Sequence, residues 1–128
     1  MASSFSQLIL DVENLDRSLQ FYEGILHLSV QHHSNLDGVK LASLLAGKTE
    51  VILVQRSPFE QNSAYDRAGG VVLNFNVNNL LGLFTEIQDT GIKVLRNVES
   101  TSLGERSLLV ADPDGYAVML SENSALMN

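Results

Sequence analysis

The sequence predicts an α+β fold in which two tandem βαβββ modules form a curved mixed sheet around a central cavity. The segment Val12-Glu13-Asn14-Leu15 recurs 65 residues later as Val77-Asn78-Asn79-Leu80. Each copy follows a strand of alternating apolar residues and opens a helical pattern, and such a unit cannot bury its apolar face alone. Because 128 residues are about the length of one domain, we predict a single domain over residues 1–128. Its parts are module one at about 5–56, a linking loop at about 57–68, module two at about 69–122 and a polar tail at 123–128.

Module one begins with a half-buried strand over residues 5–12, which places Leu8, Leu10 and Val12 on one face. Asn14 or Asp16 can cap the helix that follows. Its inward stripe at helical spacing is formed by Leu15, Leu19 and Tyr22, together with Ile25 or Leu26. Residues 28–33, 39–45 and 51–54 are then predicted strands, the first two of them joined as a hairpin.

Module two repeats this order. The pattern predicts a strand over 70–77, a helix over about 79–90, and strands over 92–98, 105–111 and 116–121. The turn before the last strand is Asp112-Pro113-Asp114-Gly115. Residues 56–68 have no clear period and mix polar with aromatic residues, which predicts a connecting loop able to cover a site.

Composition excludes several classes of function. The net charge of −7 and the pI near 4.7 would repel a phosphate backbone, so we expect no nucleic-acid partner. No run approaches the roughly 18 apolar residues of a membrane span, and no secretory signal is visible, so we expect a cytoplasmic location. The lack of cysteine removes disulfides, thiolate metal sites and cysteine nucleophiles.

Three features occur in an order that resembles the vicinal oxygen chelate superfamily. They are the repeated module, the Phe21-Tyr22 pair of the first helix, and the Asp112-Pro113-Asp114-Gly115-Tyr116 turn. The superfamily includes glyoxalase I, bleomycin resistance proteins, extradiol dioxygenases, fosfomycin resistance enzymes and methylmalonyl-CoA epimerase. The resemblance implies the paired-module architecture and a homodimer with an isologous interface. Function varies widely among such proteins, so it must be argued from the site.

The resemblance also implies where metal-using members place their ligands, namely on the first and last strand of each module. By alignment these positions are Gln7, Leu53, Val72 and Met119. Glutamine can bind a metal ion, but three of the four positions offer no imidazole, carboxylate or other oxygen donor. We therefore expect no metal and no cofactor.

Strand alternation predicts that one face of the central strands lines the cavity. Val51 and Ala117 are expected on this face beside the ligand-binding residues given below. An apolar floor with a few amide and carboxylate groups is typical of a small-molecule site. The alternative is that these side chains simply pack the centre, with their amides bonded to backbone. The predicted ligand-binding residues are Gln7, Ile9, Asp11, Leu53, Gln55, Phe59, Val72, Asn74, Asn76, Met119 and Ser121.

Asp11 is the candidate catalytic residue, because a carboxylate in an apolar cavity can act as a general acid or base. The alternative is a structural carboxylate bonded to Asn76 or Arg106. The adjacent His32 and His33 point to opposite faces of one strand, so we expect an exposed pair on an outer strand rather than a chelate. Glu99, Glu105 and Glu122 could form a displaced metal site, but no spacing supports it, so we expect them to be surface charges.

Three functions follow from these residues. The first is a metal-free protein that binds a small, largely apolar or aromatic molecule, similar to the antibiotic-resistance branch of the superfamily. The second is a metal-independent isomerase, lyase or cyclase in which Asp11 is the acid or base and Asn74 or Asn76 orients a carbonyl. The third is a metal-dependent lyase or dioxygenase, which the poor donor set disfavours.

Overall fold

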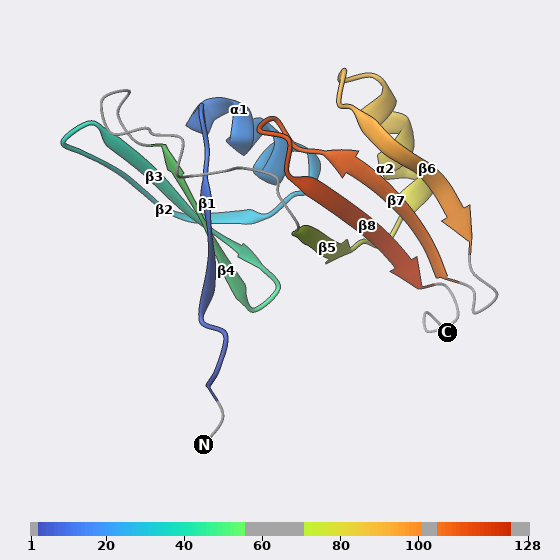
Figure 1. Ribbon diagram of the computed structural model, residues 1–128, viewed down its shortest axis with the longest axis horizontal. Helices are drawn as coiled ribbons and strands as arrows, with labels where there is room; N and C mark the ends of the chain where they lie inside the picture. Colours follow the sequence, from blue (N-terminus) through green and yellow to red (C-terminus); the bar gives the residue numbers. More distant parts are fainter. Residues whose placement is uncertain (1–2, 56–70, 101–104, 124–128) are drawn as a thin grey trace. The chain divides into compact units, whose positions relative to one another are not determined.

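The computed structural model describes residues 3–55, 71–100 and 105–123 (Figure 1). The chain divides into two compact units, residues 1–66 and 67–128. Each unit is a βαβββ module with one four-stranded mixed sheet, so the predicted α+β fold with tandem modules is confirmed. In the described part of the chain, no helix has the length and apolar character needed to span a membrane.

Unit one contains the sheet β1-β4-β3-β2. Strand β1 pairs with β4 in parallel, and the other two pairings are antiparallel. One α-helical turn continues directly into a π-helical segment between β1 and β2. The element bounds are β1 Gln7–Asp11, α1 Leu15–Leu19, η1 Gln20–Ile25, β2 Ser29–Leu36, β3 Val39–Ala46 and β4 Thr49–Gln55.

Unit two repeats this topology with the sheet β5-β8-β7-β6. Strand β5 is parallel to β8, as β1 is to β4. The turn before β8 is closed by the Asp112 carboxylate, which accepts hydrogen bonds from the backbone N–H groups of Asp114 and Tyr116, each at 2.9 Å. The element bounds are β5 Val72–Asn76, α2 Leu80–Gln88, β6 Val94–Ser100, β7 Glu105–Ala111 and β8 Ala117–Asn123.

Each sheet packs one face against the helix of its own unit. Helix α1 contacts β3 and β4, and α2 contacts β7 and β8 (Figure 1). The buried layer between sheet and helix is apolar, as the hydrophobic effect requires. We call the other side of each sheet its open face. The buried strand residues of the helix side are Leu10, Ala42, Leu44, Val51 and Leu53 in unit one, and Leu73, Leu108, Val110, Val118 and Leu120 in unit two.

The buried stripe of the first helix differs from the predicted one. Leu15 and Tyr22 are buried as expected, but Ser18 and Phe21 are also buried while Leu19 is only half-buried. Ser18, Phe21 and Tyr22 are spaced i, i+3 and i+4, so they share one face of the helix. Adjacent Phe21 and Tyr22 are therefore inside together, with ring centroids 4.9 Å apart in an edge-to-face arrangement.

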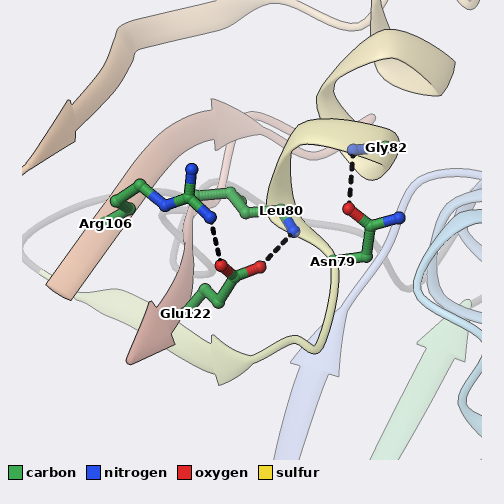
Figure 2. A network of polar contacts seen from close by, with 5 residues as sticks. All are labelled: Asn79, Leu80, Gly82, Arg106 and Glu122. Atoms are coloured by element: carbon green, nitrogen blue, oxygen red, sulfur yellow. Dashed lines mark hydrogen bonds and ion pairs between the residues drawn. The ribbon is translucent and has the colours of Figure 1, made fainter. Parts of the chain in front are cut away.

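Both helices carry an asparagine cap at equivalent positions. Asn14 Oδ1 accepts a hydrogen bond of 3.1 Å from the Arg17 N–H. Asn79 Oδ1 likewise accepts one of 3.1 Å from the Gly82 N–H (Figure 2). Replacing either asparagine with alanine should lower the free energy of unfolding by about 1 kcal/mol, because one helix N–H loses its partner. Urea unfolding measures the loss. The exposed neighbour Asn78 is the control, and an equal loss in Asn78→Ala would contradict the assignment of the caps.

Candidate functional site

The open face of unit one is defined by the register between β1 and β4. Gln7 pairs with Glu50, Ile9 with Ile52, and Asp11 with Val54. Side chains of directly paired residues project to the same side of a sheet. The open face therefore carries Glu50, Ile52 and Val54 beside the predicted β1 residues.

This register corrects the predicted face of β4, which had placed Val51, Leu53 and Gln55 beside Gln7. Leu53 is 0% exposed and pairs with Leu10 on the helix side. Gln55 also points to that side, where its Oε1 accepts a hydrogen bond of 2.7 Å from the Leu15 N–H. The cause of the error is the run of four apolar residues at 51–54, in which no alternation distinguishes the two faces.

A hydrogen-bonded group of three polar side chains lies on this open face. Gln7 Nε2 donates to Glu50 Oε1 at 2.7 Å, and Ser43 Oγ donates to Glu50 Oε2 at 2.5 Å. Ser43 belongs to β3 and pairs in register with Ile52. We call Gln7, Ser43 and Glu50 the Glu50 triplet. Glu50 and Ser43 were not among the candidates predicted from the sequence. Pairing the first strand in parallel with the fourth, with Gln7 opposite Glu50, would have placed both on this face.

Apolar side chains surround the Glu50 triplet. Ile9 is 56% exposed in the middle of β1, and its partner Ile52 is half-buried. Leu45 of β3, which pairs with Glu50 of β4, is 36% exposed. Such exposed aliphatic groups on a sheet face are surface that a ligand can cover.

The charged side chains on the open face of the four strands of unit one are carboxylates. Its four strands contribute Asp11 and Glu50 but neither lysine nor arginine, and His32 pairs in register with Ser43. Asp11 is half-buried at the end of β1, and its role as an acid or base stays a prediction. The described residues of this face are Gln7, Ile9, Asp11, Ser29, His32, Ser34, Leu41, Ser43, Leu45, Glu50, Ile52 and Val54.

The open face of unit two is richer in amides and hydroxyls. The register places Val72, Asn74 and Asn76 on the same side as Ala117, Met119 and Ser121. Ser121 is buried, and its Oγ donates to Asn74 Oδ1 at 2.8 Å. Farther along the sheet, Arg96 Nη2 donates to Ser107 Oγ at 2.8 Å. Val72 is 51% exposed, so this face also combines apolar surface with polar groups.

Glu122 lies on the helix side of unit two and is buried, which corrects the prediction that it is a surface charge. Its Oε2 accepts a hydrogen bond of 2.7 Å from the Leu80 N–H, and its Oε1 forms an ion pair with Arg106 (Figure 2). These two contacts, the backbone hydrogen bond first, lower the pKa of the Glu122 carboxyl below its ordinary value. Arg106 is therefore the partner of Glu122.

The two adjacent histidines of the chain lie on an edge strand of unit one. His32 and His33 are exposed on the edge strand β2 and face opposite sides of the sheet, as expected. Phe59 and the predicted linking loop lie outside the described residues.

Comparison with known proteins decides the family. The model of the Glyoxalase/Bleomycin resistance protein/Dioxygenase superfamily matches residues 4–120, which is nearly the whole chain. The chain belongs to this superfamily. Its two βαβββ modules have the same element order as the resemblance implied. No curated protein of significantly similar sequence was found.

Solved structures of this superfamily share the fold at low sequence identity. A glyoxalase family protein from Bacillus cereus has a TM-score of 0.80 and 15% identity, and the match covers 95% of each chain. A glyoxylase/bleomycin resistance protein/dioxygenase domain from Frankia sp. has a TM-score of 0.72 and 22% identity, over 96% of this chain and 99% of that one. The fosfomycin resistance protein FosX from Mesorhizobium loti has a TM-score of 0.70 and 17% identity, over 94% and 91%.

The metal-ligand positions that the superfamily implies do not fit a metal ion in this chain. Met119 pairs with Asn74 as Ile52 pairs with Ile9, so the position in unit one equivalent to Met119 is Ile52 rather than Leu53. Ile52 and Val72 have no donor atom and Met119 has only a thioether, so Gln7 is the one position of the four that offers an oxygen ligand. Among the residues that the structure describes, no group of three or more histidines, cysteines and carboxylates could hold a metal.

Proposed function

We propose that this protein binds a small, largely apolar or aromatic molecule on the open faces of its sheets without a metal ion. One observation carries the proposal. Three of the four positions where the superfamily would place metal ligands carry side chains unsuited to a metal, while Ile9 and Val72 expose about half of their surface on those same faces.

The energetics of the open faces support binding. Burial of an aliphatic side chain contributes about 1.5–3 kcal/mol when it is complete, so Ile9, Val72 and their neighbours give an apolar ligand substantial surface to cover. Amide and hydroxyl groups beside them, such as Asn74 and Ser121, can fix the orientation of the ligand. This combination suits a protein that sequesters a small molecule.

Native mass spectrometry with elemental analysis of the untagged protein tests the absence of a metal. We expect a substoichiometric transition-metal content, because the positions implied for the ligands are occupied by Ile52, Val72 and Met119. One firmly bound transition metal per chain would overturn the metal-free proposal. An organic adduct in the same spectrum would give the mass of the natural ligand.

Naphthylmethanol, a flat neutral probe, tests the apolar face. We expect titration by calorimetry or by protein NMR to show binding to the wild type, and Ile9→Ser to weaken it about tenfold, since lost apolar burial of about 1.4 kcal/mol corresponds to that factor. Leu81→Ser is the matched control, because Leu81 is 50% exposed but lies on α2 rather than on an open face. An equal loss in both variants would contradict the proposed face.

The oligomeric state and the cellular location of the protein are also proposals. We propose a cytoplasmic homodimer. Light scattering of the untagged protein at micromolar concentration should give twice the chain mass of 14.0 kDa, and a monomeric mass would remove the dimer.

A further inference from the structure

We infer that the Glu50 triplet is a binding subsite that selects ligands carrying a protonated nitrogen. The inference rests on the proposed function, because it assumes that a small molecule covers the open face of unit one. It adds the chemical class of one end of that molecule, namely a cationic amine attached to an apolar body.

The internal repeat indicates that the fold does not require the triplet. Strand register gives each member of the triplet an equivalent in unit two: Gln7 pairs with Glu50 as Val72 pairs with Ala117. Ser43 pairs with Ile52 as Leu109 pairs with Met119. All three equivalents are apolar, yet unit two forms the same sheet with the same strand order. The residues equivalent to Gln7, Ser43 and Glu50 are Val72, Leu109 and Ala117.

The geometry of the triplet fixes the carboxylate without neutralising it. Each oxygen of Glu50 accepts one hydrogen bond, from Gln7 at 2.7 Å or Ser43 at 2.5 Å. A carboxylate has about four acceptor sites, so further sites remain available for a ligand. Both donors are neutral groups, an amide and a hydroxyl, and the negative charge is therefore not balanced by either of them.

Covering such a carboxylate with a purely apolar ligand is unfavourable. A molecule that lies on Ile9, Leu45 and Ile52 removes water from Glu50, and an ionised group that loses water without a compensating partner is costly. A ligand ammonium group removes this cost, because it donates a charge-assisted hydrogen bond to the carboxylate. The lack of lysine and arginine among the described residues of this face favours a cation over an anion.

Three probes of one shape test the inference. They are naphthylmethylamine, naphthylmethanol and naphthoate, which differ in the charge of a single substituent. All titrations are run at the same pH, about 8. We expect the wild type to bind the amine about tenfold more tightly than the alcohol, and naphthoate most weakly, since hydrogen bonds to charged groups are the stronger class.

Glu50→Gln should remove the preference for the amine, because the amine loses its charge-assisted hydrogen bond while naphthylmethanol no longer has to cover an ionised group and should bind more tightly than to the wild type. Glu23→Gln is the matched control, because it removes the same charge from an exposed residue of η1 outside the open face, and it should keep the preference. Glu50→Ala introduces the residue that unit two has at this position. Its circular dichroism should match the wild type, and its thermal midpoint should fall slightly because the buried Ser43 hydroxyl loses its acceptor.

The possible failures separate the two proposals. If the amine and the alcohol bind equally well to the wild type, or if Glu50→Gln keeps the preference, the cationic subsite is wrong while binding to the open face stands. If none of the three probes binds, both proposals are overturned. If Glu50→Ala fails to fold, the triplet is structural and the subsite is again contradicted.

Discussion

Leu53→Ala should lower the free energy of unfolding by about 2–5 kcal/mol, the range for truncating a buried leucine. Leu53 is 0% exposed and pairs in register with Leu10 on the helix side of β4. Truncation leaves a cavity that the surrounding side chains of α1, β1 and β3 fill only in part. Urea unfolding followed by circular dichroism measures the loss.

The neighbouring residue provides the control for this prediction. Ile52 follows the opposite phase of β4 and is half-buried on the open face, so Ile52→Ala should cost less stability than Leu53→Ala and should weaken the binding of naphthylmethanol. Leu120 and Met119 form the equivalent pair in unit two. If Ile52→Ala were the more destabilising substitution of the first pair, the assignment of the two faces of β4 would be wrong.

The overall fold could be predicted because its signals are local. The repeat at Val12 and Val77, the alternation of apolar residues and the turn residues each depend on neighbours in the chain. Asn14 was one of two candidate caps, and the structure assigns the cap to it. The order of elements in both modules follows the prediction.

The face of β4 could not be predicted because it depends on pairing with a strand far away in the sequence. Val51-Ile52-Leu53-Val54 is apolar throughout, so a shift of one residue fits the sequence equally well and moves every side chain to the other face. The parallel register with β1 settles the phase. The predicted face of β4 also concealed Glu50. In the predicted phase of the strand, Glu50 would point to the helix side, whereas in the observed register it lies beside Gln7 on the open face.

The π-helical segment is a second feature that local patterns do not reveal. The prediction placed Leu19 inside because it follows Leu15 by four residues, whereas the structure centres the buried face on Ser18 and so buries Phe21 and Tyr22. Residues Gln20–Ile25 are π-helical, which no sequence pattern indicated. The buried Ser18 lies beyond hydrophobic patterning altogether, because a small hydroxyl gives no apolar signal.

The repeat also makes a comparison of the two helix caps possible. In both units the first N–H of the helix donates to a side chain of the last strand, Leu15 to Gln55 and Leu80 to Glu122, each at 2.7 Å. The residues that pair with these acceptors across the sheet are also equivalent, Lys40 in unit one and Arg106 in unit two. The two units therefore differ at this point mainly in whether the acceptor is charged.

Because the Leu80 N–H and Arg106 lower the pKa of Glu122, the sign of its contribution to stability is fixed. The ionised carboxylate stabilises the fold above the ordinary glutamate value of 4.5, and this contribution is lost as pH falls through the lowered folded-state value. Glu122→Gln keeps an acceptor for the Leu80 N–H but has no charge. We therefore expect Glu122→Gln to be less stable than the wild type at neutral pH, and to lose less stability on acidification below 4.5.

The reciprocal substitution should transfer this acid sensitivity to unit one. Gln55→Glu places a carboxylate between the Leu15 N–H and Lys40, in the arrangement that Glu122 has with the Leu80 N–H and Arg106. Urea unfolding at a series of pH values should show a steeper loss of stability in acid for Gln55→Glu, a shallower one for Glu122→Gln, and a slope near the wild type for the double variant. Hydrogen exchange should place the new acid sensitivity in α1. If the slope of Glu122→Gln equals that of the wild type, the carboxylate at the α2 cap does not couple folding to pH, and acid sensitivity must arise from other groups.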